Sequence, residues 1–333
     1  MFFYICRDLK VSINYRRIFE MIGRHLLRIK VFQTIYAYRK NDERDFKAVY
    51  SELQTSIHKS YQLYLSTLQF LLELKQFSEH RILQIQSRVI KDEEEWKRLV
   101  PFAENKILNQ LENNKTLQTT IRNEKISWHE HQDIVKELFT YIIESEQYKK
   151  FCAHEPSYYN TKKFIKYILY SVILQSESFF WFIEESSIFW NDDVDQIVAM
   201  VFKTLNNFTE KNPEGGEILG KFHDADAQVF VEQLFSHTLK NWDEYSVYIT
   251  ERLKNWDHDR MAEIDIILLQ IAIAEAIHFH EIPVRVTLNE YIELSKLYST
   301  DKSNIFINGI LHSIFDDLQE QKIIVKKGRG LLQ

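Results

Sequence analysis

The scarcity of glycine and proline constrains the fold of this chain more than any other feature. Its 333 residues include seven glycines and four prolines, whereas average usage is roughly 7% and 5%. Sheet proteins and phosphate-binding loops need glycine in tight turns with positive φ. The composition therefore predicts long helices joined by few sharp turns, which is the all-α fold class. With 45% hydrophobic residues, the chain can fill one large core or two medium ones.

The net charge of −6 conceals a basic N-terminal region. Residues 1–40 carry nine lysines and arginines against Asp8 and Glu20, a local charge of +7 that leaves −13 for the remainder. Arg24 and Arg28 lie four residues apart in a predicted helix over 22–40, so their side chains should project from the same side. This pattern indicates an anionic partner for one face, and a solvated basic face is the alternative.

Cysteine usage and hydropathy bear on the compartment. Cys6 and Cys152 are too few for a disulfide framework or a four-cysteine zinc site, which fits a reducing cytoplasm. The most apolar stretch, 167–183, contains Glu177 and is followed at once by Glu184. We therefore predict a buried helix there, no membrane-spanning segment, and a cytoplasmic protein.

Apolar residues at helical spacing place the elements of the C-terminal third. Further helices are predicted over about 224–240, 243–254, 261–279 and 303–319. The region from 44 to 211 is also helical in pattern, and the NPEGG segment at 212–216 is the clearest boundary, because it combines proline with two glycines.

Four residues of this part carry more specific predictions. Thr287 and Glu290 have the spacing of a capping box that opens a helix. Gly309 costs its helix about 1 kcal/mol of propensity, so a close helix–helix approach is predicted there. Asp265 and Glu275 lie in the nearly all-apolar segment 261–279 and need partners if they are buried.

Catalytic templates find no match. The chain has neither the G-x-x-x-x-G-K-S/T nor the G-x-G-x-x-G phosphate loop. Glu275 and His278 have the E-x-x-H spacing of di-iron bundles, but the second such pair that those sites require is missing. No sequence motif identifies a general base next to a serine or cysteine nucleophile. We therefore predict no enzyme, no cofactor and no metal site.

A specific motif lies in the segment 256–315 and resembles the C-terminal core of the NusB family. The residues that match in register are Pro283, Val286, Asn289, Glu290, Glu293, Leu294, Lys296, Tyr298, Ser303, Phe306, Asn308 and Gly309. The helix over 22–40 resembles the arginine-rich opening of the family through Arg24, Arg28, Gln33, Ile35 and Tyr36. His25 and Leu26 depart from that opening, where members often carry further arginines.

The resemblance implies a NusB-like helical bundle with an additional helical region inserted after the first helix. The first helix of the core would occupy 21–43, the insertion 44–216 and the rest of the core 217–320. Residues 321–333 form a basic tail, and residues 1–20 an extension that is disordered or precedes the natural start, since Met21 begins like a family member.

The same resemblance implies an RNA-binding transcription antitermination factor. Such a protein binds a boxA-like single-stranded ribosomal leader RNA together with the ribosomal protein NusE, within the transcribing RNA polymerase complex. The residues expected to bind RNA are Arg24, Arg28, Lys30, Tyr36, Tyr298, Lys302, Ser303 and Phe306. This function requires the cationic first helix to lie beside the 303–306 turn, so that both form one surface for unpaired nucleotides.

By family position, Asp259 and Asp265 would meet NusE, because acidic side chains suit a basic ribosomal protein. An intramolecular cap or salt bridge is the alternative for Asp265.

Two other classes of protein compete with this interpretation. The first is a non-enzymatic helical scaffold that binds protein partners through the insertion. The second is an RNA methyltransferase, since NusB-like modules occur fused to such enzymes. That class needs a cofactor-binding α/β domain, whose glycines and alternating strands the insertion lacks.

Overall fold

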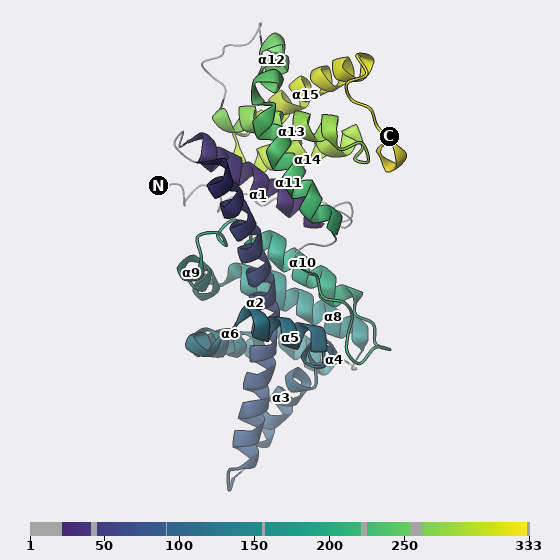
Figure 1. Ribbon diagram of the computed structural model, residues 1–333. Coiled ribbons are helices and arrows are strands. Elements are labelled where there is room, and N and C mark those ends of the chain that lie inside the picture. Colours follow the sequence, from purple (N-terminus) through teal and green to yellow (C-terminus); the bar gives the residue numbers. More distant parts are fainter. Residues whose placement is uncertain are drawn as a thin grey trace. The chain divides into compact units, whose positions relative to one another are not determined.

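The computed structural model describes residues 22–40, 45–90, 92–154, 157–220, 225–253 and 262–331. Helices and their connections make up all of these ranges, and no strand occurs within them (Figure 1). The prediction of an all-α fold is therefore confirmed. The proposed extension 1–20 lies outside the described residues.

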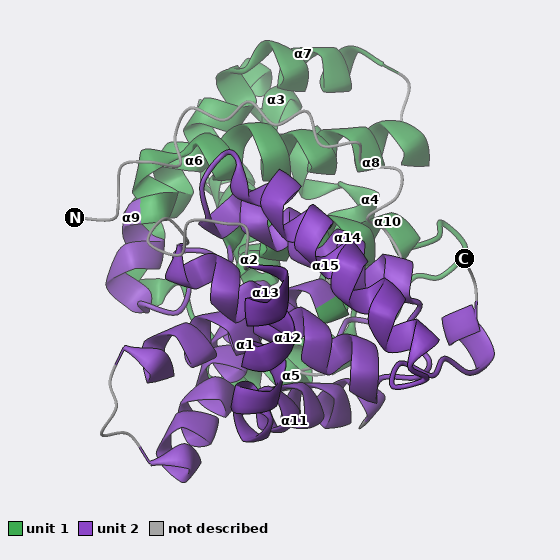
Figure 2. Cartoon of the chain, turned by 90° about the horizontal axis from the view of Figure 1, so that it is seen from above, with its two compact units in different colours: residues 1–24, 66–180, 194–217 green, residues 25–65, 181–193, 218–333 purple. Residues whose placement is uncertain are grey.

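The chain divides into two compact units (Figure 2). Unit 1 comprises residues 1–24, 66–180 and 194–217, and unit 2 comprises residues 25–65, 181–193 and 218–333. The long helix α2 (Phe46–Gln86) therefore belongs to unit 2 up to Leu65 and to unit 1 from Ser66 onward. These limits differ from the predicted insertion 44–216, since two parts of it fall in unit 2.

Unit 1 is built from short helices around an aromatic core. Besides the second part of α2, its elements are α3 (Glu93–Ala103), α4 (Lys106–Glu112), α5 (Lys115–Glu124), α6 (Gln132–Glu144), α7 (Glu146–Ala153), α8 (Tyr158–Tyr167), the start of α9 (Glu177–Ser186) and α10 (Val194–Asn207). The Phe70 ring contacts those of Trp128 and Phe179, with centroids 4.6 Å and 5.5 Å away. Such contacts add to the stabilisation that burial of the rings provides.

The segment 212–216, predicted as a boundary, is a loop that packs against the helices of unit 1. The Asn114 amide donates to the carbonyls of Glu214 and Gly216.

The stretch 167–183, predicted as one buried helix, is buried in part but is not one helix. A π-helical turn (Ile168–Val172) and a 3-10 turn (Ile173–Gln175) follow α8, and α9 begins only after Ser176. None of the described helices has the length and apolar character needed to cross a bilayer.

Unit 2 surrounds the buried helix α13 (Glu263–His278). Packed against it are α11 (Ala225–Lys240), α12 (Trp242–Arg252), α14 (Val284–Tyr298) and α15 (Ser303–Glu320). Helix α1 (Ile22–Arg39) adds Leu27, Val31 and Ile35 to the same core. The helices predicted over 22–40, 224–240, 243–254, 261–279 and 303–319 are thus confirmed within two residues at each end.

The predicted capping box is wrong. Helix α14 begins earlier, after Pro283, so Thr287 lies inside it. The Thr287 hydroxyl donates to the Glu275 carboxylate at 2.8 Å, and Glu290 contacts His25 and Arg28. Proline in place of a polar cap is compatible with a helix start, because proline has no N–H to satisfy and its φ is already helical.

The close approach predicted at Gly309 is also wrong. Gly309 is exposed on α15, and no atom lies within 4 Å of the position that a Cβ would occupy. Helix packing therefore does not require a glycine at this position.

Candidate nucleic-acid interface

Arg28, expected on the surface, is fully buried in unit 2. Its Nε donates to Glu275 Oε2 at 2.7 Å and its Nη2 to Glu275 Oε1 at 2.8 Å, a bidentate pair. Burial alone would lower the pKa of the guanidinium, but Glu275 and Glu290 raise it well above its ordinary value. The prediction that Arg28 projects beside Arg24 into solvent is therefore wrong. The reason is a carboxylate supplied by α13, which lies 247 residues away in the sequence.

The Arg28–Glu275 pair is the centre of a buried polar network. Glu275 also accepts hydrogen bonds from the hydroxyls of Thr287 (2.8 Å) and Tyr291 (3.1 Å). Burial opposes the ionisation of Glu290, yet Arg28 and His25 outweigh this effect and lower its pKa. Every charge in the network has a partner, as buried ions require, so the network fixes α1 against α13 and α14.

Lys30 is buried as well, with its Nζ 2.7 Å from Asp193 Oδ1. The same Nζ donates to the Phe189 carbonyl at 3.2 Å, and Ser60 donates to Asp193 at 2.5 Å. Burial raises the pKa of Asp193, and Lys30 counteracts that shift. The expected surface position of Lys30 is thus wrong, because Asp193 supplies a buried carboxylate that pairs with it. This pair holds the segment 181–193 within unit 2.

The remaining predicted residues of α1 lie nearer the surface. Arg24 is half-buried in the first turn, and Tyr36 is half-buried near the C-terminal end. Lys40 Nζ lies 5.5 Å from the centroid of the Tyr36 ring and pairs with Glu263. Sequence reasoning counted Lys40 in the basic region but not in the site, although its spacing of four residues from Tyr36 was a usable signal.

Helix α1 lies beside the turn between α14 and α15. The Phe32 and Tyr298 rings are in contact, with centroids 5.0 Å apart, and Gln33 Nε2 donates to the Tyr298 hydroxyl at 3.2 Å. Tyr36 follows Phe32 along the helix, with ring centroids 6.3 Å apart. The structure therefore brings Tyr36 and Tyr298 into one aromatic cluster around Phe32, although these residues come from separate ends of the sequence.

The start of α15 is held from beneath by α13. Asp265 is buried and accepts hydrogen bonds from the hydroxyls of Ser299 (2.5 Å) and Ser303 (2.8 Å). Ser303 is therefore buried and positions the turn, whereas Lys302 is exposed and Phe306 half-buried. No side chain caps the first turn of α15, so its N–H groups can meet an anion. Asp259 lies outside the described residues.

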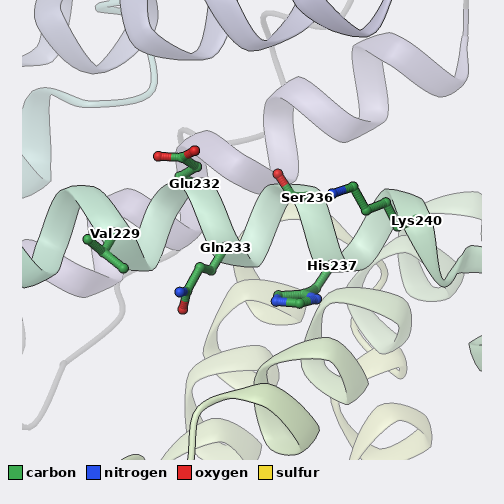
Figure 3. A pocket seen from close by; sticks show the side chains of 6 residues that line it. All are labelled: Val229, Glu232, Gln233, Ser236, His237 and Lys240. Atoms are coloured by element: carbon green, nitrogen blue, oxygen red, sulfur yellow. The ribbon is translucent and has the colours of Figure 1, made fainter.

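A surface pocket and the grouping of metal-ligating side chains bear on small-molecule and metal binding. A pocket on α11 is lined by Val229, Glu232, Gln233, Ser236, His237 and Lys240 (Figure 3). One helix supplies this whole lining, so the pocket is a surface depression and lacks the converging walls of a ligand site. Within the described ranges, no three histidine, cysteine or acidic side chains are grouped to hold a metal ion.

Comparison with known proteins decides the family. The NusB family model matches residues 195–316. The transcription antitermination protein NusB of Salinibacter ruber is 40% identical over 109 residues, which are 33% of this chain and 68% of that protein. This chain belongs to the NusB family. The NusB of Chloroherpeton thalassium is 38% identical over 109 residues, and there the match spans only about half, 52%, of the relative's length.

The NusB of Natranaerobius thermophilus is 38% identical over 93 residues, which are 28% of this chain and 67% of that protein. Among solved structures, T. maritima NusB is similar at 21% identity and covers 47% of this chain and 91% of its own, with a TM-score of 0.28. The family relationship therefore rests on sequence. The matched residues include the α13–α15 region up to residue 316, with Tyr298 and the open start of α15, whereas α1 with Phe32 and Tyr36 lies outside them.

Proposed function

We propose that this chain is a non-enzymatic, RNA-binding transcription antitermination factor. It would bind a boxA-like single-stranded leader RNA together with NusE, within the transcribing RNA polymerase complex. Membership of the NusB family and the names of its relatives support this proposal.

The observation that carries the proposal is the position of α1 beside the open start of α15. The half-buried rings of Tyr36 and Tyr298 both lie beside Phe32, and unpaired bases stack on such rings. Lys302 and the uncapped N–H groups of α15 lie next along the chain and suit phosphates. Unit 2 thus offers aromatic rings for bases, and a lysine and a helix start for phosphates.

Burial divides the expected site residues by role. We assign RNA contact to Arg24, Tyr36, Tyr298, Lys302 and Phe306, which all have exposed surface. Arg28, Lys30 and Ser303 are buried in polar networks, so we assign them to positioning. Asp265 is engaged with two serine hydroxyls, which favours the intramolecular alternative, so NusE binding rests on the family alone.

The test is the affinity of the full chain for a labelled boxA-like RNA, with and without NusE, at several salt concentrations. We expect NusE to tighten binding and Lys302→Ala to weaken it. The salt slope should fall by about 0.7, the contribution of one phosphate contact on a single strand. Lys296→Ala is the matched control, because Lys296 is exposed on α14 and pairs with Glu293. Equal effects of both variants, or no response to NusE, would contradict the proposal.

A further inference from the structure

Helix α8 of unit 1 has a basic outer face on an acidic protein. Between 149 and 170 the chain carries five lysines and a single acid, Glu155, whereas its overall charge is −6. Tyr159, Lys163 and Lys166 are all exposed, and their spacing of four and three residues places them on one side of the helix. We call these three residues the α8 face.

Aromatic rings lie among these lysines. Lys162 Nζ is 5.1 Å from the centroid of the Tyr158 ring. Lys166 Nζ is 5.9 Å from the Tyr170 ring and 5.6 Å from that of Phe202, which comes from the neighbouring helix α10. Cations and π-faces therefore alternate along α8 and its border with α10. The two helices are neighbours in the fold (Figure 1).

Acidic partners distinguish other lysines of the same unit from Lys162 and Lys163. Lys106 pairs with Glu210, Lys115 with Glu214, and Lys149 with Glu146. Across the part of the chain that the structure describes, neither Lys162 nor Lys163 forms an ion pair with a carboxylate. Their charge is left uncompensated, and it makes this side of unit 1 attractive to a polyanion.

We propose that the α8 face binds single-stranded RNA, with phosphates on the lysines and a base stacked on Tyr159. The Tyr159 side chain is 75% exposed, and a tyrosine ring presented beside lysines suits an unpaired base next to its own phosphate. An acidic protein partner could form ion pairs with the lysines, but it has no bases to stack on the Tyr159 ring. A duplex would not offer its bases for stacking. The inference rests on the proposed function in taking RNA as the ligand, and adds a contact outside the NusB-like core.

The experiment measures the fluorescence anisotropy of a labelled single-stranded RNA of mixed sequence, without a boxA-like element, titrated with the full chain. The double variant Lys163→Glu/Lys166→Glu should bind at least tenfold more weakly, with a salt slope smaller by about 1.4 for two lost phosphate contacts. The matched control, Lys106→Glu/Lys115→Glu, makes the same charge change in the same unit at exposed, paired lysines. It should alter binding less than twofold.

Tyr159→Ala separates stacking from charge. It should weaken binding about fivefold or more while leaving the salt slope unchanged, and Tyr159→Phe should restore binding, because the ring and not the hydroxyl stacks. An RNA that carries 5-iodouridine should cross-link to Tyr159. Far-ultraviolet circular dichroism checks that each variant retains its helices.

Three outcomes would overturn the inference. One is an equal loss of RNA affinity in the control variant Lys106→Glu/Lys115→Glu, which would indicate general electrostatic attraction without a specific site. Another is unchanged affinity in Tyr159→Ala, and the third is competition by poly-aspartate as strong as that of RNA at equal charge, which would indicate an acidic protein partner. Failure of the proposed function is separable, since it would abolish the NusE-dependent binding of boxA-like RNA and the effect of Lys302→Ala while leaving these results unchanged.

Discussion

At the scale of single residues, burial determines what a basic side chain can do. Three cations of α1 lie within seven residues, yet Arg28 and Lys30 are enclosed by protein and only Arg24 keeps exposed surface. The spacing of Arg24 and Arg28 correctly predicts a helix but not which residue faces inward. Their carboxylate partners come from segments that sequence periodicity cannot connect to α1.

Replacing Arg28 should therefore affect stability before it affects RNA binding. Arg28→Ala leaves Glu275 as a buried charge without its partner, and loss of one member of such a pair costs about 3–5 kcal/mol. Urea denaturation followed by circular dichroism measures the change. Lys149→Ala is the control, because its ion pair with Glu146 is exposed, and it should shift the midpoint little. A midpoint for Arg28→Ala equal to that of the control would contradict the role assigned to the pair.

A histidine pair in unit 2 predicts sensitivity to acid. The rings of His237 and His278 stack 3.7 Å apart, and burial, with His237 and His280 nearby, lowers the pKa of His278 from 6.5 to about 4. The unfolded chain then binds more protons than the native chain between these two values. Stability that is present above about pH 6.5 is lost as the pH falls toward 4.

The measurement is urea unfolding of the unsubstituted protein and of His278→Gln at several pH values across this window. The unsubstituted protein should lose more stability on acidification than the variant, which lacks the titrating ring. Parallel pH profiles for the two proteins would show that His278 does not contribute.

At the scale of helices, Gly309 makes α15 less stable than it would be with alanine at this position. Gly309 is exposed and nothing lies near its absent Cβ, so the glycine costs helix propensity without improving a contact. Gly309→Ala should stabilise the protein by about 0.5–1 kcal/mol, measured as a higher urea midpoint at an unchanged m-value.

Gly330 provides the opposite case for comparison. A Cβ there would lie 2.0 Å from the His280 carbonyl oxygen, so Gly330→Ala should destabilise the protein. If both alanine variants were stabilised or both destabilised, the local packing described for these glycines would be incorrect.

Helix positions are the part of the fold that sequence predicts well. The apolar run of α13 and the apolar repeat of α15 are local signals, and both helices lie where these signals predict. The capping-box motif failed because Pro283 can begin α14 without a side-chain cap. The 303–306 turn was expected at the site, but the burial of Ser303 depends on Asp265 from another helix, which no local pattern reveals.

At the scale of the whole molecule, unit 2 is discontinuous in sequence. Val49, Leu53 and Ile57 of α2 are buried in the core of unit 2, and Asp193 neutralises Lys30 there. These contacts join segments more than a hundred residues apart, so the predicted insertion 44–216 included residues on which unit 2 depends.

Excising residues 44–216 should consequently disrupt the core. Each lost aliphatic side chain contributes about 1.5–3 kcal/mol, so we expect no cooperative thermal transition, as measured by calorimetry. A control that removes only residues 71–178 keeps both segments of unit 2. Its ends can be joined by a short linker, because the rings of Phe70 and Phe179 lie 5.5 Å apart. A sharp transition of the 44–216 deletion at the melting temperature of the full chain would contradict the division into units.

The enclosed Arg28–Glu275 pair also limits how this protein can change over generations. Substituting either residue alone leaves an unpaired charge in the protein interior, so single mutations at these sites are expected to be selected against. Two apolar residues of matching volume can replace such a pair at little cost, although that route requires simultaneous change. Substitutions in the first helix at Arg28 are thereby coupled to substitutions in the central helix at Glu275.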